Sequence, residues 1–263
     1  ANLPNRLALT RAAGLTCKPN PHYILCEQLN APRLPADLTK CGVSRLGEVL
    51  MMRYAAAIGL GLGIFTADMA LAQDVRITPA RAQTSFEING QTFTIARNQD
   101  TADTLTGEFA RTSRECPPFC ITPMIVAEGV ATLGELEVIR FLEQDAVAGA
   151  GLLIDSRLPD WFVQGTIPGA VNVPFQTLDM ANPYRDDILR ALGAVKLADG
   201  TLDFGQARAL LLFSNGAWSD QSPRAIRSLL DAGYPASKLS HYRGGMQSWR
   251  ALGLTVAIPR NEG

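Results

Sequence analysis

Residues 210–233 read LLLFSNGAWSDQSPRAIRSLLDAG and combine a short apolar run, a polar loop and a helical pattern. The apolar run, 210–213, is typical of a strand that is covered on both faces in a parallel sheet. The helix is predicted to take Ser222 as its N-cap and Pro223 as its first residue, and to end at Gly233. Its apolar face would carry Ile226, Leu229 and Leu230. The stretch therefore predicts half of a βα unit in an α/β fold.

The loop between this strand and helix lies where α/β sheets place their ligands, at the carboxyl end of a strand. Backbone N–H groups at a helix start favour an anion there. An ordinary βα connection without a ligand remains the alternative. If the loop binds an anion, the binding residues are expected to be Asn215, Gly216, Ala217, Trp218, Asp220, Gln221 and Ser222.

A second segment, 151–157, has the same form: GLLIDSR is an apolar run that ends in polar residues. Two parallel strands end at the same edge of a sheet, so both segments are expected to contribute to one site. Asp155 and Arg157 are predicted to pair and to hold the two loops in register, a structural role favoured over a catalytic one. Downstream, residues 165–174 read GTIPGAVNVP, in which Pro168-Gly169 predicts a turn.

These motifs resemble the rhodanese-like (sulfurtransferase) domain. Its first half carries Asp-x-Arg, an aromatic residue and Gly-His-Ile-Pro-Gly-Ala-x-Asn-x-Pro, and this chain matches except that Thr166 replaces the histidine. Residues 242–253, YRGGMQSWRALG, resemble the closing Gly-Gly-x-x-x-Trp-x-x-x-Gly signature. The resemblance covers residues 122–258. It implies a three-layer α/β fold with a central parallel sheet.

The resemblance also implies that the covalent chemistry is missing. In rhodanese-like domains the residue after the second strand is a cysteine that carries sulfane sulfur as a persulfide, and here that residue is Ser214. A subgroup has a second loop cysteine, which aligns with Ser219. Thiol exchange requires a thiolate, and serine forms neither a thiolate nor a sulfur–sulfur bond. The serines arise either by natural replacement or by deliberate Cys→Ser exchange.

A serine nucleophile would need an adjacent base. The chain has two histidines, His22 and His241. His22 precedes the part assigned below to the mature protein, and His241, at the end of an expected strand, is interpreted as a surface or satisfied polar residue. Serine-hydrolase chemistry is therefore not favoured.

Composition limits the remaining classes. The chain has 263 residues, 47% of them hydrophobic, and a formal net charge of −1. These values fit one or two globular domains and indicate no basic surface for nucleic acid. No cofactor is expected. No metal site is expected either, because Cys116 and Cys120 without a neighbouring histidine would leave half of a zinc shell empty.

An internal segment has the features of a secretory signal peptide. Met51-Met52-Arg53 precedes an apolar run, 54–66, and the small-residue sequence Ala70-Leu71-Ala72. We interpret 51–72 as the signal peptide and 1–50 as an upstream or non-native segment. The competing interpretation keeps 1–50 as a genuine extension and 54–72 as a core helix or membrane anchor. The favoured interpretation predicts a periplasmic or secreted protein with no membrane association after cleavage.

Residues 73–121 are predicted to form a small extension. The segment 85–95 alternates in polarity on either side of Asn89-Gly90, a strong hairpin signal. The segment 101–112 is expected to form a short helix. In an oxidising compartment Cys116 and Cys120 are expected to pair, and three interpretations stay open: a structural disulfide, a redox or sulfur-accepting pair, and two free thiols.

Two functions follow. The first is a periplasmic rhodanese-like protein without sulfurtransferase turnover of its own, which binds a small oxyanion or a sulfur-donor protein in the Ser214 loop. The second is an active thiosulfate sulfurtransferase or thiol-redox enzyme that uses Cys116 or Cys120. The position of these cysteines relative to the Ser214 loop separates the two.

Overall fold

The computed structural model describes residues 15–20, 23–28 and 74–259. The chain divides into two compact units, residues 1–66 and 67–263. In the first unit, β1 (Leu15–Asn20) pairs antiparallel with β2 (Tyr23–Gln28), an element that the sequence analysis does not predict. The proposed signal peptide, 51–72, lies outside the described residues. No helix in the described part of the chain is both long and apolar enough to cross a membrane.

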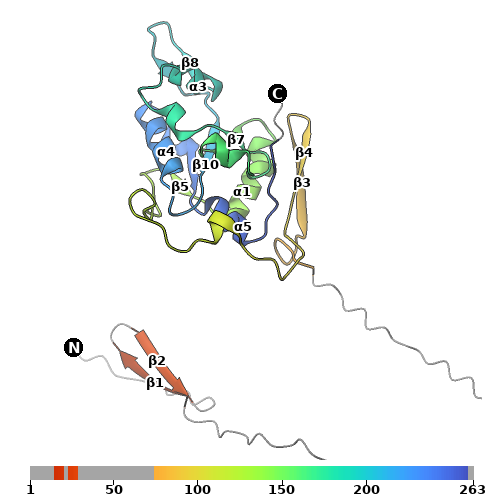
Figure 1. Ribbon diagram of the computed structural model, residues 1–263. Helices are drawn as coiled ribbons and strands as arrows, with labels where there is room; N and C mark the ends of the chain where they lie inside the picture. Colours follow the sequence, from red (N-terminus) through yellow and green to blue (C-terminus); the bar gives the residue numbers. More distant parts are fainter. Residues whose placement is uncertain (1–14, 21–22, 29–73, 260–263) are drawn as a thin grey trace, which may run out of the picture. The chain divides into compact units, whose positions relative to one another are not determined.

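The second unit is built on a five-stranded parallel sheet, which confirms the predicted fold class (Figure 1). Its strands follow the order β5 (Ala131–Thr132), β11 (Leu239–Tyr242), β10 (Ala209–Phe213), β6 (Gly151–Asp155) and β7 (Val171–Asn172). The two predicted apolar strands, β10 and β6, are neighbours, and β10 occupies the centre. Side chains on β10 are buried from both sides, as its continuous apolar sequence predicts.

Helices cover both faces of the sheet and complete the three layers (Figure 1). Leu211 and Phe213 point to the face that packs against α1 and α5, whereas Leu210 and Leu212 point to the face that packs against α3 and α4. This alternation gives the domain two apolar layers around one sheet. The helical segments are η1 (Gly107–Ala110), α1 (Glu135–Phe141), the π-helical turn η2 (Leu142–Ala146), α2 (Pro159–Phe162), η3 (Phe175–Leu178), α3 (Arg185–Ala191), α4 (Gln221–Asp231), η4 (Ala236–Lys238) and α5 (Gly245–Ala251).

The predicted hairpin is present as β3 (Gln83–Ile88) and β4 (Gln91–Ala96). Asn89 and Gly90 both have positive φ, at 51° and 79°, as a two-residue hairpin turn requires. The hairpin packs on the α1 and α5 face, where Ile95 is fully buried. A second, small antiparallel pair joins β8 (Val195–Lys196) to β9 (Leu202–Asp203).

The chain after α5 fastens this hairpin to the domain. The backbone N–H of Asn98 donates to the Gly253 carbonyl at 2.7 Å, and that of Thr255 donates to the Ala96 carbonyl at 3.0 Å. Beyond this point, Thr166 and Ala257 exchange two backbone hydrogen bonds of 2.8 and 2.9 Å. Leu254 lies among the buried residues of the same face.

Local predictions of helix starts were less accurate. Helix α4 begins at Gln221 rather than after Ser222, because the Asp220 carbonyl accepts from the Arg224 N–H at 2.8 Å and the Ser222 hydroxyl bonds elsewhere. The segment 101–112 contains only the 3-10 turn η1.

Candidate ligand site at the carboxyl edge of the sheet

Three strands end side by side at the predicted edge. Phe213 of β10 is in register with Asp155 of β6 on one side and with Tyr242 of β11 on the other. The segments that follow these strands therefore meet, and the site is assembled from the Ser214 loop (Ser214–Ser222), Arg157 and the turn before α5.

The Ser214 loop keeps most of its backbone N–H groups free. Only the Ser219 N–H among them donates within the described part of the chain, to the Gly216 carbonyl at 2.9 Å. Unpaired N–H groups at the start of a helix are donors that can bind an anion. The free donors are those of the predicted anion-binding residues, Asn215, Gly216, Ala217, Trp218, Asp220, Gln221 and Ser222.

The opposite side of the loop's backbone is fixed by α5. The N–H groups of Met246 and Gln247 donate to the carbonyls of Ser214 and Asn215 at 3.0 and 2.9 Å. Gly245 makes this approach possible: a Cβ at this position would stand 2.3 Å from the Ser214 carbonyl oxygen. With its carbonyls held by α5, the loop has its N–H groups left for a ligand.

Ser214, Ser222 and His241 form a buried chain of hydrogen bonds. The Ser214 and Ser222 hydroxyls are 3.0 Å apart, and the Ser222 hydroxyl lies 3.1 Å from Nε2 of His241. Burial, followed by the charge of Arg243, lowers the pKa of His241 to about 4, so the imidazole is neutral near pH 7. Its Nδ1 has no partner among the described residues.

This position corrects the interpretation of His241 as a surface or satisfied residue, since the side chain is 2% exposed and half paired. No local pattern in the sequence indicates this position, because it depends on β11 lying next to β10 with both strands ending at the same edge. Ser214 itself is 2% exposed, and no described cavity is lined by it.

Asp155 and Arg157 pair as predicted, fully buried, with Nη2 of Arg157 2.6 Å from Oδ2 of Asp155. Thr166, which stands at the family's histidine position, donates to the same oxygen at 2.7 Å. Arg157 also donates to the Gly165 carbonyl at 2.7 Å and to Asn215 Oδ1 at 3.4 Å. The pair thus connects the 165–166 turn to the Ser214 loop, the structural role that the sequence analysis favours.

A segment of the extension, residues 114–122, covers the Ser214 loop; we call it the cover segment. Thr122 donates from its N–H and its hydroxyl to the Ala217 carbonyl, at 2.8 and 2.9 Å. The guanidinium carbon of Arg114 lies 3.6 Å from the centroid of the Trp218 ring. Phe119 meets the same ring edge to face, with centroids 5.7 Å apart. These contacts explain why the loop is largely shielded from solvent.

Cys116 and Cys120 lie in this cover segment and are bonded to each other, with Cα atoms 4.7 Å apart. The Cys116–Cys120 pair therefore offers no free thiol to the Ser214 loop, but it lies in the segment that contacts this loop. The sequence analysis missed Arg114, Thr122 and Gln247 as loop contacts, because nothing in their spacing places them near residue 218. Among the described residues, no three His, Cys, Asp or Glu side chains gather in a way that could hold a metal ion.

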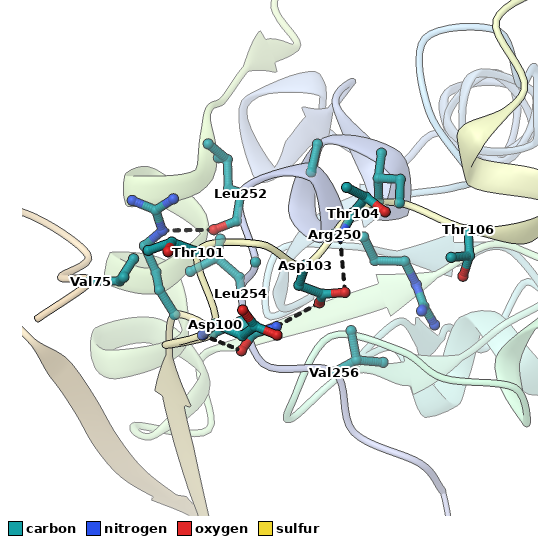
Figure 2. A pocket seen from close by; sticks show the side chains of 15 residues that line it. Val75, Asp100, Thr101, Asp103, Thr104, Thr106, Arg250, Leu252, Leu254 and Val256 are labelled. Atoms are coloured by element: carbon teal, nitrogen blue, oxygen red, sulfur yellow. Dashed lines mark hydrogen bonds between the residues drawn. The ribbon is translucent and has the colours of Figure 1, made fainter. Parts of the chain in front are cut away.

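Neither of the two cavities described in the second unit is lined by a residue of the Ser214 loop, although Arg157 lines the smaller one. One, of about 210 Å³, is lined by Phe109, Arg157, Trp161 and Arg250 among others. The other, of about 500 Å³, lies between α5 and the segment after β4; Figure 2 shows it with Arg250 from α5 and Asp100 and Asp103 from that segment. Burial and the neighbouring Arg157 charge lower the pKa of Arg250.

Comparison with known proteins agrees with the motifs and the fold. Residues 137–252 match the rhodanese-like domain, and this part of the chain is a rhodanese-like domain. A curated relative, the HTH-type transcriptional regulator Rv0324 of Mycobacterium tuberculosis, is 32% identical over 109 residues, which are 41% of this chain. The match spans only 38% of that relative's length.

Among solved structures, the human single domain sulfurtransferase TSTD1 is 24% identical, with 46% of this chain and 96% of that chain covered and a TM-score of 0.33. A thiosulfate sulfurtransferase from Pseudomonas aeruginosa is 23% identical, with 50% and 21% covered and a TM-score of 0.36. A possible tyrosine phosphatase from Rhodopseudomonas palustris is 21% identical, with 50% and 88% covered and a TM-score of 0.36.

Proposed function

We propose that this chain is a periplasmic rhodanese-like protein that binds a small oxyanion, or an anionic sulfur group on a partner, in the Ser214 loop without transferring sulfur through that loop. The observation that carries the proposal is the set of free backbone N–H groups in the loop, at the start of α4. Such donors favour a negative charge, and the dipole of an 11-residue helix adds to them.

The absence of turnover follows from Ser214. Its side chain hydrogen-bonds to Ser222, and through Ser222 it reaches a neutral His241. An alcohol in this position cannot exist as a thiolate or hold a second sulfur atom. The loop would therefore bind an anionic sulfur donor without accepting a sulfur atom from it.

The proposed location rests on two features. The residues Met51, Met52 and Arg53 precede an apolar run that ends in a small-residue motif, as in a signal peptide. The disulfide between Cys116 and Cys120 suits an oxidising compartment.

Turnover is tested by measuring thiosulfate:cyanide sulfurtransferase activity of the chain beside Ser214→Cys. We expect no activity for the chain itself, and for the variant a mass increase of one sulfur atom on residue 214 after thiosulfate treatment. Activity in the chain that persists in Cys116→Ser/Cys120→Ser would contradict the proposal, because neither the loop nor the pair could then account for it.

Binding is tested by titrating the protein with sulfate, sulfite and thiosulfate while amide resonances are followed by NMR. We expect the largest shifts at residues 215–222. Shifts confined to Arg97 or Arg250, which line the larger cavity, would place the anion elsewhere and reject the loop as its site.

A second function is supported by the contact between the cover segment and the loop: a thiol enzyme that uses Cys116 or Cys120. It predicts that the chain has turnover and that Cys116→Ser/Cys120→Ser loses it. The same assay therefore separates the two functions.

A further inference from the structure

We propose that the Cys116–Cys120 disulfide is a redox site that is reduced by a dithiol protein docking on the cover segment and the residues just after it, and that its reduction loosens this segment from the Ser214 loop. The redox step stands independently of the proposed function. Its effect on anion binding rests on that function.

The position of the disulfide favours reaction with external thiols over stabilisation of the fold. It links residues only four apart, so it closes a very short loop and restrains the unfolded chain less than a long-range crosslink would. It joins no two distant elements of the domain. Cys116 is exposed to solvent, and exposed disulfides are the ones that exchange readily with external thiols.

The surface around the disulfide fits a protein partner better than a small reductant. Four large apolar side chains within seven residues face solvent, with Ile121 84% exposed. Several large apolar side chains that are exposed close together indicate a contact surface. The docking surface consists of Phe119, Ile121, Met124 and Ile125.

A dithiol protein is the occupant that this surface specifies, because Cys120 of the reactive bond lies between Phe119 and Ile121 in the sequence. A thiolate of the partner attacks Sγ of Cys116, a mixed disulfide forms, and Cys120 leaves as a thiolate. The partner's second thiolate then attacks the partner's own sulfur in the mixed disulfide and releases Cys116 as a thiolate. Two electrons pass from the dithiol to the Cys116–Cys120 pair, the partner becomes a disulfide, and each released thiolate takes a proton from water according to its pKa.

Reduction acts on the loop through Trp218. Arg114, two residues before Cys116, lies over the face of the Trp218 ring, and Phe119, next to Cys120, meets its edge. The disulfide closes the turn between these two contacts, together with a hydrogen bond of 2.9 Å from the Phe119 N–H to the Glu115 carbonyl, while Arg114 is also paired with Glu108 at 3.2 Å. Thr122 remains held by Ala217 and by two donors from Arg243, at 3.1 and 2.7 Å, so the segment would pivot there rather than detach.

The first experiment follows the redox step in the full chain. The oxidised protein is incubated with thioredoxin or with dithiothreitol, free thiols are alkylated, and the tryptic peptide 115–140, which contains both cysteines, is quantified. We expect reduction by both, and a thioredoxin that lacks its resolving cysteine should be trapped on Cys116. A pair that stays oxidised in excess thioredoxin overturns the proposal.

The docking surface is tested by the ratio of the two reduction rates. Ile125→Asp should slow reduction by thioredoxin about tenfold while leaving the dithiothreitol rate unchanged. A charge that becomes buried when thioredoxin docks weakens that protein–protein contact, whereas a small thiol makes no such contact. The matched control is Met180→Asp, which changes an 80% exposed apolar residue outside the docking surface and should alter neither rate. Equal slowing by both reductants, or none, rejects the docking surface.

The structural consequence is read from tryptophan fluorescence and from tryptic cleavage after Arg111 and Arg114. Reduction should change the emission of the chain but not that of Trp218→Phe, and it should speed cleavage at both arginines. Cys116→Ser/Cys120→Ser should behave like the reduced chain. If reduction changes neither the fluorescence nor the cleavage rate, the disulfide does not control the contact of the cover segment with the Ser214 loop.

Anion affinity is measured last, with thiosulfate, on the oxidised chain and on Cys116→Ser/Cys120→Ser. Tighter binding to the variant supports the coupling of the two sites. Absence of binding to either form, with the fluorescence and cleavage changes present, rejects the proposed function and leaves the redox site standing. Equal binding to both forms rejects the coupling.

Discussion

The Ser222 hydroxyl lies 3.1 Å from Nε2 of His241, a contact that joins the first turn of α4 to the end of β11 inside the domain. Since the pKa of His241 is lowered to about 4, the folded protein disfavours the charged imidazole. The unfolded chain takes up this proton near pH 6.5. Stability from this group is therefore complete above pH 6.5 and is lost as the pH falls from 6.5 to about 4.

We expect a loss on the order of 3 kcal/mol across this window, about 1.4 kcal/mol for each unit of pKa difference. Urea unfolding at pH 7 and pH 4.5 measures it, and His241→Gln isolates the contribution of His241 from that of the carboxylates. The same pH dependence in both proteins would show that His241 is not protonated on unfolding.

Asp155→Ala is expected to destabilise the domain by about 3–5 kcal/mol, because it leaves the fully buried guanidinium of Arg157 without its counter-charge. Thr166 would also lose its acceptor. Thermal unfolding measures the effect. Asp187→Ala serves as the control, since it breaks an exposed pair with Arg190 and should cause no measurable change.

Gly245→Ala should displace the Ser214 loop, since its Cβ would stand 2.3 Å from the Ser214 carbonyl oxygen and 2.7 Å from the Gly216 nitrogen. Gly90→Ala is the matched control: its φ is also positive, but nothing lies within 4 Å of the added methyl group. We expect the Gly245 variant to lose about 1–3 kcal/mol more than the control, from overpacking alone. Chemical denaturation of both variants checks this. Equal losses in the free energy of unfolding would mean that the Ser214 loop can shift away from the added methyl group without cost.

Ile95→Ala tests whether the hairpin belongs to the core of the domain. Its side chain is fully buried, so the expected cost is about 2–5 kcal/mol. Ile258→Ala removes a side chain that is 65% exposed and should cost little. If both variants unfold at the same denaturant concentration as the unchanged protein, the hairpin does not contribute to the stability of the domain.

The parts of the fold that the sequence predicts are those with strong local signals. The apolar runs of β6 and β10 and the Asn89-Gly90 turn determine their elements almost alone. The rhodanese-like motifs place β6 and β10 in one sheet. The start of α4 was placed two residues late, because Ser222, a good capping residue, is used in a tertiary contact instead.

The site was only partly predictable for the same reason. Ser214, Asp155 and Arg157 follow apolar strands, and the edge of the sheet brings them together. The contacts of Arg114 and Phe119 with Trp218 join residues about a hundred positions apart, and no periodicity records such contacts. His241 shows no local sign of burial either, since its role depends on the neighbour of its strand.

The backbone pairing of Asn98 with Gly253, and of Ala96 with Thr255, bears on where the folding unit ends. The matched range, 137–252, excludes both partners of each pair. It also excludes Ile95 and Leu254, whose side chains complete the apolar layer on the α1 and α5 face. A fragment cut to the matched range would expose that layer to water. The part of the chain that folds as one unit is thus larger than residues 137–252, the part that matches the rhodanese-like family.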